Sequence, residues 1–282
     1  MASVELEALG ELDLAQLDQL ARLREAVIGL AKRAGAAIMD VYAGNIEVTA
    51  KSDASPLTIA DLRAHEIILA GLHALTPQWP VLSEESSEIP FAERSTWSTY
   101  WLVDPLDGTK EFVSRNGEFT VNIALVHHHN VALGVVYVPA SDTTYSGAPG
   151  LDAQRQQGGG PSQTICVTSK VSQPVRVVGS RSHRSAELDA YLSRLGAHAI
   201  LSMGSAVKFC VVAEGGADLY PRLGPTSEWD TAAAQAVVEA AGGVVCLLNG
   251  ERLRYNTKQE LLNPSFMVFG DRSRDWLQPL KQ

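Results

Sequence analysis

Residues 101–112 read Trp-Leu-Val-Asp-Pro-Leu-Asp-Gly-Thr-Lys-Glu-Phe, an apolar run that ends in two acids. The run is typical of a buried strand that leads directly to Asp104. Pro105 follows, and because proline has a fixed φ and no N–H group, we expect strand pairing to stop there. Asp107 comes three residues after Asp104, across a tight turn. The spacing therefore predicts two carboxylates that converge on one point at a strand end.

The turn also offers ligands for a cation and for an anion. Hard divalent cations take oxygen ligands, and the two aspartates with the Leu106 carbonyl between them suit Mg²⁺. The N–H groups of Gly108 and Thr109, at the start of a helical turn, would hold an anion beside that cation. A metal next to a helix N-terminus in one loop describes a phosphate site. The alternative is a strand end followed by a simple Asp-capped turn.

Other acids stand at comparable places along the chain. Glu84 and Glu85 close the preceding apolar run, and strand ends at one edge of an α/β sheet face the same crevice. Asp230 directly precedes a predicted helix, and Asp61 lies in the first turn of another. Each acid alone fits a structural role, such as a helix cap that interacts with the helix dipole. Together they favour one shared metal site.

The charge balance limits the classes of partner. The 282 residues contain 32 Asp and Glu against 23 Lys and Arg, a net charge of −9. This excess of acid argues against nucleic-acid polymers and against a polybasic membrane anchor. It does not exclude a small anion, because bound cations reverse the local sign. We find no secretory signal and no transmembrane segment, and expect a cytoplasmic protein. Peripheral association with the inner membrane is an alternative, and both a monomer and a homodimer stay open.

The hydrophobic pattern divides the chain into two halves. Residues 1–160 are predicted to be an α+β half with an antiparallel sheet, which carries most of the metal ligands. Residues 161–282 alternate between strands and helices, which predicts an α/β half with a mostly parallel sheet. The second half would carry the substrate-recognition residues and Asp230. The predicted helices of the first half, its hairpin and a linker or surface loop span residues 14–42, 58–75, 119–138 and 146–163.

Four motifs together resemble the inositol monophosphatase superfamily of lithium-sensitive, Mg²⁺-dependent phosphatases. They are K-x-D-x-S-P-x-T-x-A-D, S-E-E-S, W-L-V-D-P-L-D-G-T-K-E-F and E-W-D-T-A-A, at residues 51–61, 83–86, 101–112 and 228–233. The Lys-Glu-Phe of residues 110–112, where inositol phosphatases more often carry Thr-Asn-Phe, resembles the 3′(2′),5′-bisphosphate nucleotidase branch. So do residues 179–183, 204–209 and 220–230. One departure is Ser83, where many members have glycine, and it removes no ligand.

The resemblance implies a layered α/β fold of the αβαβα, sugar-phosphatase-like type and two or three Mg²⁺ ions. It implies metal ligation by Glu84, Asp104, the Leu106 carbonyl, Asp107, Asp230 and Asp61. Glu84 and the pair formed by Asp61 and Thr109 would act in catalysis by orienting the attacking water. Gly108, Thr109 and Asp230 would also contact the substrate.

Cations in the second half indicate a pocket for a further phosphate. Ser205 and Lys208 lie one turn apart at a predicted helix start, so a hydroxyl and an ammonium group can converge there. His183 and Arg222 each follow a strand end. Solvated surface cations are the simpler interpretation of each residue alone. We favour binding because all of them stand at the same inferred edge as the acids.

The expected reaction is the hydrolysis of adenosine 3′,5′-bisphosphate to AMP and phosphate, which clears a by-product of sulfate assimilation. An inositol-1-phosphate or fructose-1,6-bisphosphate phosphatase is the alternative among enzymes. A phosphometabolite sensor on the same fold is the alternative without catalysis. The presence of Glu84, Asp104, Asp107, Thr109 and Asp230 argues against the sensor, because a sensor does not need residues that activate water.

Overall fold

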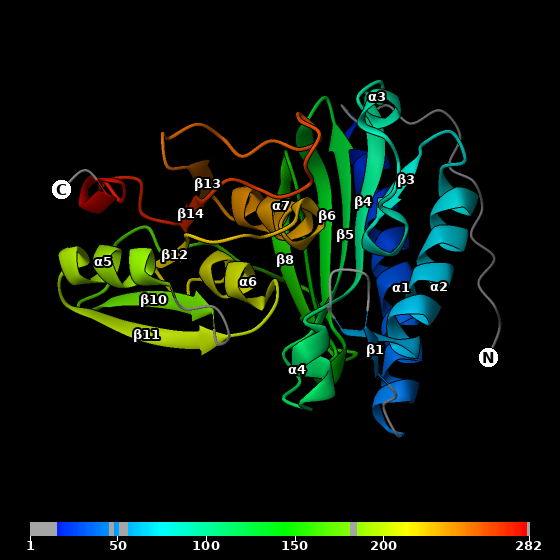
Figure 1. Ribbon diagram of the computed structural model, residues 1–282, viewed down its shortest axis with the longest axis horizontal. Coiled ribbons are helices and arrows are strands. Elements are labelled where there is room, and N and C mark those ends of the chain that lie inside the picture. Colours follow the sequence, from blue (N-terminus) through cyan, green and yellow to red (C-terminus); the bar gives the residue numbers. More distant parts are fainter. Residues whose placement is uncertain (1–15, 45–47, 51–55, 181–184, 281–282) are drawn as a thin grey trace.

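The computed structural model describes residues 16–44, 48–50, 56–180 and 185–280 (Figure 1). The described residues form two large sheets and one small one. In the seven-stranded sheet, each strand pairs with the next one along the chain. Its strands are β3 (Val81–Ser83), β4 (Thr99–Asp107), β5 (Thr120–His127), β6 (Asn130–Val138), β7 (Thr143–Ala148), β8 (Leu151–Gln157) and β9 (Gln163–Thr164).

The five-stranded sheet has the order β11-β10-β12-β14-β13. Its strands are β10 (Val175–Ser180), β11 (His198–Met203), β12 (Leu219–Arg222), β13 (Val244–Leu247) and β14 (Phe266–Phe269). The small sheet pairs β1 (Val48–Ala50) with β2 (Pro56–Thr58). The α-helices are α1 (Leu17–Tyr42), α2 (Ile59–Leu75), α3 (Phe91–Arg94), α4 (Thr109–Val113), α5 (Ala186–Leu195), α6 (Val207–Ala213) and α7 (Ala232–Ala240).

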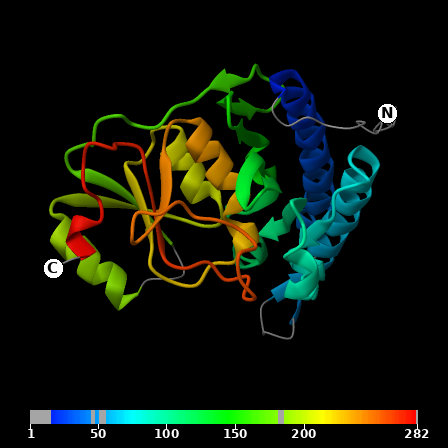
Figure 2. The ribbon, with the colours of Figure 1, turned by 90° about the horizontal axis from the view of Figure 1, so that it is seen from above.

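The two large sheets alternate with three layers of helix, as seen from two directions in Figures 1 and 2. Helices α1 and α2 cover one face of the seven-stranded sheet, α6 and α7 lie between the sheets, and α5 covers the outer face of the five-stranded sheet. The residues of strand β5 are almost all apolar because helices cover both faces of the sheet at this strand. Ile123 and Leu125 pack toward α1, whereas Ala124 and Val126 pack toward α7. The predicted layered αβαβα fold is confirmed.

The second sheet corrects one detail of the prediction, because it is mixed. Strand β10 runs parallel to β11 and to β12, but β14 runs antiparallel to both β12 and β13. The expectation of a mostly parallel sheet therefore holds only for β10, β11 and β12. The reason is the connection from β13 to β14, which contains no crossover helix and so returns the chain in the opposite direction.

The predicted linker at residues 146–163 is wrong, because most of it lies in strands β7, β8 and β9, of which β9 is the edge strand of the sheet. Strand β8, next to that edge, reads Leu-Asp-Ala-Gln-Arg-Gln-Gln, and only its Ala153 is buried. Strands near an edge that carry polar side chains have little hydrophobic periodicity, and their backbone pairing holds them in place. Helix α7, from the second half of the chain, packs on β5, β6 and β7 of the first sheet. The division of the chain at residue 160 stays a prediction.

Strand β4 also differs from the expectation that pairing stops at Pro105. Its pairing with β5 skips this proline and resumes where Asp107 faces Thr120. A bulge between Asp104 and Asp107 absorbs the residues that cannot join the ladder. The same bulge bends the strand and turns both aspartates toward one side.

Within the described residues, none of the helices combines the length and the apolar character that crossing a bilayer requires.

Candidate active site

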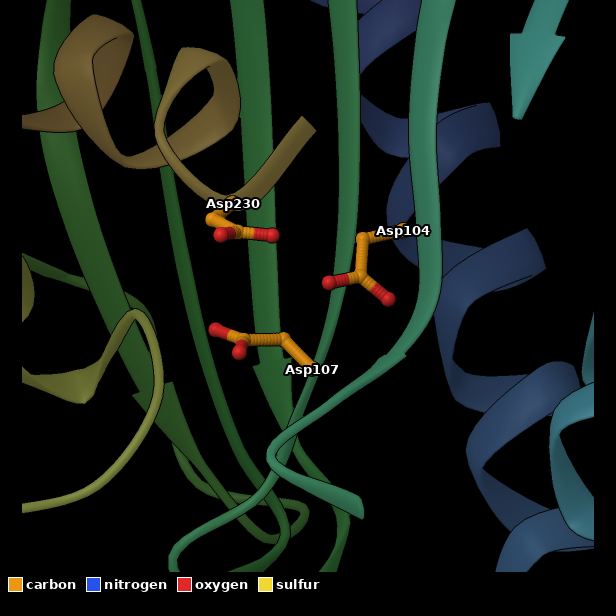
Figure 3. A group of neighbouring side chains, drawn as sticks. All are labelled: Asp104, Asp107 and Asp230. Carbon is orange, nitrogen blue, oxygen red and sulfur yellow. The ribbon is translucent and has the colours of Figure 1, made fainter. Parts of the chain in front are cut away.

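Three aspartates from two distant parts of the chain form the centre of the site. Asp104 and Asp107 flank the bulge of β4, and Asp230 ends a short 3-10 helix, Glu228–Asp230, just before α7. Their carboxylates face one another in Figure 3, and oxygen atoms of all three lie within 4.8 Å of each other. The sequence placed these acids at one edge, and the structure brings them together.

Glu84 joins this group because of the register between two parallel strands. Ser83 of β3 pairs with Val103 of β4, so the residues that follow, Glu84 and Asp104, leave the sheet side by side. The Glu84 side chain forms a hydrogen bond with Asp104, and its charge contributes to the raised pKa of that aspartate. The expectation that both strands end at one crevice is confirmed by this register.

Burial dominates the electrostatics of the three aspartates. It raises the pKa of Asp104 and of Asp230 well above the usual range, and neighbouring carboxylates raise both further. It raises the pKa of Asp107 to about 6, although Lys208 and the Ala206 N–H group oppose the shift. Carboxylates this close, of which Asp104 is buried and the other two are half-buried, repel one another unless protons or cations neutralise them. A set of oxygen donors with this spacing therefore fits a hard divalent cation such as Mg²⁺.

Asp61 lies in the first turn of α2, where hydrogen bonds from Thr58 fix its side chain. The backbone N–H of Thr58 donates to Asp61 Oδ2 at 2.8 Å, and the Thr58 hydroxyl donates to the same oxygen at 2.7 Å. The Thr109 hydroxyl reaches Asp61 Oδ1 at 3.3 Å and the Leu106 carbonyl at 3.4 Å. The structure thus brings Asp61 and Thr109 together, next to the loop that carries Asp107.

Two contacts to Asp107 were not expected from the sequence. The Ala206 N–H donates to Asp107 Oδ2 at 2.6 Å, and the Asn122 side chain donates to it at 3.4 Å. Asn122 is fully buried within the apolar strand β5. A buried amide in such a strand is itself a signal, because buried polar groups need partners. No sequence signal points to a backbone N–H group such as that of Ala206.

A cavity of about 210 Å³ joins the acids to the cations of the second half. Its lining includes eight predicted residues, namely Glu84, Asp107, Gly108, Thr109, Ser205, Lys208, Arg222 and Asp230. Lys110 and Glu111 of the 101–112 stretch also line it and had no predicted role. His183 lies outside the described residues.

Lys208 is the most buried cation among the described residues that line this cavity and is only 7% exposed. Its Nζ donates to the Ser205 carbonyl at 2.6 Å and lies 5.7 Å from the centre of the Tyr220 ring. Burial lowers the pKa of Lys208 to about 8, while the charge of Asp107 opposes the shift. Arg222 is held at the rim by hydrogen bonds to the Thr226 hydroxyl and the Pro225 carbonyl. Acids and cations therefore line one cavity; its acidic side, with Glu84, Asp107 and Asp230, is called the metal wall, and its cationic side, with Ser205, Lys208 and Arg222, is called the cation wall.

Comparisons with known proteins agree with this arrangement. The sequence profile of the inositol monophosphatase family matches residues 19–273. The chain is 51% identical over 244 residues to the 3′(2′),5′-bisphosphate nucleotidase CysQ of Escherichia coli K12, covering 86% of this chain and 97% of that protein. It is 35% identical over 251 residues to CysQ of Haemophilus influenzae, covering 89% and 93%.

A solved structure shows the same fold. The chain superposes on CysQ from Bacteroides thetaiotaomicron, a bacterial member of the inositol monophosphatase family, with a TM-score of 0.79 and 42% identity. The match covers 89% of this chain and 98% of that one. The family match, the relatives and the layered fold with its aspartate cluster lead to one conclusion: the chain belongs to the inositol monophosphatase family of phosphatases.

Proposed function

We propose that the protein is an Mg²⁺-dependent 3′(2′),5′-bisphosphate nucleotidase that hydrolyses adenosine 3′,5′-bisphosphate to AMP and phosphate. This activity would clear a by-product of sulfate assimilation. One observation carries the proposal. A single cavity is lined both by Asp107 and Asp230 of the aspartate cluster and by the buried Lys208, so it can engage two phosphates of one small molecule. The CysQ relatives, which are named as 3′(2′),5′-bisphosphate nucleotidases, support it.

The metal ligands proposed are Asp104, Asp107, Asp230, Glu84, the Leu106 carbonyl and Asp61, for two or three ions. The three aspartates fit the role because their burial leaves charge that only protons or cations can neutralise. When bound, Mg²⁺ supplies Lewis acidity, which lowers the pKa of a water and stabilises negative charge on phosphoryl oxygens.

The residues around the metal loop would orient the attacking water and the reacting phosphate. Asp61 accepts two hydrogen bonds from Thr58, so its remaining oxygen is directed to the Thr109 hydroxyl. Thr109 can then accept a hydrogen bond from a water while it donates to Asp61. Glu84 is proposed as the second group that orients this water. The N–H groups of Gly108 and Thr109 would bind oxygens of the phosphate that is cleaved.

The cation wall would bind the phosphate that is not cleaved. Lys208 is buried and its Nζ donates to the Ser205 carbonyl, and the charge of Asp107 only partly offsets the effect of burial on its pKa. A phosphate would supply further negative charge. Ser205, Arg222 and His183 are proposed as its further partners. An inositol monophosphate has no second phosphate for this wall, and the nucleotidase activity for which the relatives are named disfavours fructose bisphosphate.

The test is a phosphate-release assay with Mg²⁺, in the presence and absence of Li⁺. The substrates are adenosine 3′,5′-bisphosphate, adenosine 3′-monophosphate, inositol-1-phosphate and fructose-1,6-bisphosphate. We expect the highest kcat/KM for the nucleoside bisphosphate, inhibition by Li⁺ and no turnover in EDTA. Preference for another substrate would reject the nucleotidase assignment, and no release from any of them would favour the sensor alternative.

A further inference from the structure

The segment Gly204-Ser205-Ala206 crosses from the second sheet to the metal loop, between β11 and α6. Ser205 adopts a left-handed backbone conformation with φ of 43°. A serine rarely adopts this conformation, and it persists where the surrounding structure imposes it. The segment lines the cavity on the side of Lys208, so the contacts that hold Ser205 in this conformation also shape that side of the cavity.

A carboxylate holds each side of Ser205. The N–H of Gly204 donates to Glu118 Oε2 at 2.7 Å, and the N–H of Ala206 donates to Asp107 Oδ2 at 2.6 Å. Both are charge-assisted hydrogen bonds, which are stronger than neutral ones. Asp107 belongs to the aspartate cluster, whereas Glu118 lies two residues before β5, outside that cluster. Glu118 therefore holds the segment without being one of the proposed metal ligands.

The packing around two glycines fits the same arrangement. A Cβ atom on Gly204 would lie 2.6 Å from Glu111 Cγ and 2.9 Å from the Glu118 carbonyl oxygen. A Cβ atom on Gly108 would lie 3.1 Å from the same carbonyl oxygen and 3.3 Å from Ser205 Cβ. Glu118 thus packs against the metal loop and against the Ser205 segment at once. No side chain fits between them at Gly204.

The conformation of Ser205 in turn sets the position of the buried cation. Lys208 Nζ donates to the Ser205 carbonyl at 2.6 Å. The Ser205 hydroxyl is buried and has no hydrogen-bond partner among the described residues. A phosphate oxygen bound beside Lys208 would satisfy that hydroxyl. The backbone at Ser205 therefore positions two groups that face the second phosphate.

We propose that Glu118 is a positioning residue that holds Ser205 in its left-handed conformation and thereby places Ser205 and Lys208 for the phosphate that is not cleaved. This inference rests on the proposed function, since it assigns a role in binding the second phosphate of the substrate. Glu118 itself does not touch the reacting atoms. Its contribution is selectivity for a bisphosphate over the corresponding monophosphate.

The experiment compares KM for adenosine 3′,5′-bisphosphate and adenosine 3′-monophosphate, which differ only in the 5′-phosphate. Glu118→Ala removes the acceptor for the Gly204 N–H, and we expect KM for the bisphosphate to rise about tenfold. KM for the monophosphate should stay unchanged, because the segment that Glu118 holds would bind only the phosphate that the monophosphate lacks. Glu118→Gln keeps an oxygen acceptor and should stay within about threefold of the wild type. Glu93→Ala removes an exposed carboxylate on α3 and is the matched control.

A second variant tests the same contact from the other side. Gly204→Ala places a methyl group against Glu111 and the Glu118 carbonyl, so it should displace the segment and raise KM for the bisphosphate in the same selective way. Melting temperatures show whether each variant is folded. If Glu118→Ala does not fold, Gly204→Ala and Glu118→Gln decide the question.

Two results would overturn the role of Glu118. One is an unchanged KM for the bisphosphate in the folded variants, and the other is an equal rise for both substrates, as a merely structural role would produce. Failure of the proposed function gives a different result. In that case the wild-type protein itself releases no phosphate from the bisphosphate, or does not prefer it over the monophosphate.

Discussion

The two walls of the cavity differ in how their residues are held. On the metal wall, Glu84 follows strand β3, whereas Asp104 and Asp107 lie in strand β4, and local bonds orient them, such as that from the Leu106 N–H to Asp104 Oδ1 at 3.0 Å. Asp230 joins these acids from the second half of the chain. On the cation wall, Ser205, Lys208 and Arg222 all come from the second half of the chain. A contact between residues about a hundred positions apart, Ala206 and Asp107, links the two walls. Most acids of the metal wall thus come from one local segment, and the position of the cation wall beside them depends on tertiary packing.

The largest expected effect comes from removing one carboxylate of the metal wall. Asp107→Asn should lower kcat/KM for the bisphosphate and the monophosphate alike, by about 10³-fold or more, because metal and phosphate binding both depend on it. Steady-state kinetics and circular dichroism measure activity and fold, with Glu93→Gln as control. If Asp107→Asn turns over substrate at nearly the wild-type rate, the metal assignment is wrong.

The second prediction concerns the stability of the metal-free protein against pH. Asp107 has a pKa of about 6 when folded and an ordinary value of 3.8, and burial also raises the pKa of Asp104 and Asp230. The folded protein therefore holds protons that the unfolded chain releases, so stability should fall as pH rises from about 4 through 6. For Asp107 alone the loss is about 3 kcal/mol.

Urea unfolding in EDTA and in Mg²⁺, at pH values from 4 to 7, measures this effect. We expect Mg²⁺ to restore stability at pH 7, because the cation then replaces the protons. The variant Asp107→Asn should show a shallower dependence on pH in EDTA. A stability that rises with pH in EDTA, or one that Mg²⁺ leaves unchanged at pH 7, would contradict the prediction.

The third prediction tests whether the cation wall acts only on the second phosphate of the substrate. Lys208→Ala should raise KM for adenosine 3′,5′-bisphosphate about 30-fold, because it removes a buried cation that would pair with the second phosphate. KM for adenosine 3′-monophosphate should change much less. Lys170→Ala, at an exposed lysine, controls for loss of charge. Equal effects on both substrates would rule out the second-phosphate role of Lys208.

The smallest expected effect concerns the local hydrogen bonds that fix Asp61 at the start of α2. Thr58→Ala removes the N-cap of α2 and one of the two bonds from Thr58 to Asp61. The free energy of unfolding should fall by about 1 kcal/mol, as is typical of lost N-caps. Thr58→Ser keeps the hydroxyl and serves as the control. A serine variant as unstable as the alanine variant would show that the cap does not contribute.

Much of the metal wall could be predicted from residue spacing. Asp104 and Asp107 converge because three residues across a turn leave little freedom, and Glu84 joins them because neighbouring parallel strands end together. Strands β7, β8 and β9 could not be recognised, because backbone pairing rather than apolar periodicity holds them in the sheet. The antiparallel course of β14 was missed for a similar reason, since strand direction depends on how the chain returns.

Sequence alone was sufficient where a function depends on neighbours in the chain. The acids at strand ends, the cap of α2 and the family resemblance of residues 101–112 are all of this kind, since local geometry follows from local residues. Tertiary structure decided the rest of the site. The contact of Asn122 joins the neighbouring strands β4 and β5, and the contacts of the Ala206 N–H and of Glu118 join segments from the two halves of the chain that only tertiary packing brings together. The role of a backbone N–H group, or of a carboxylate such as Glu118, cannot be predicted from the sequence, because it depends on the partner that the fold places beside it.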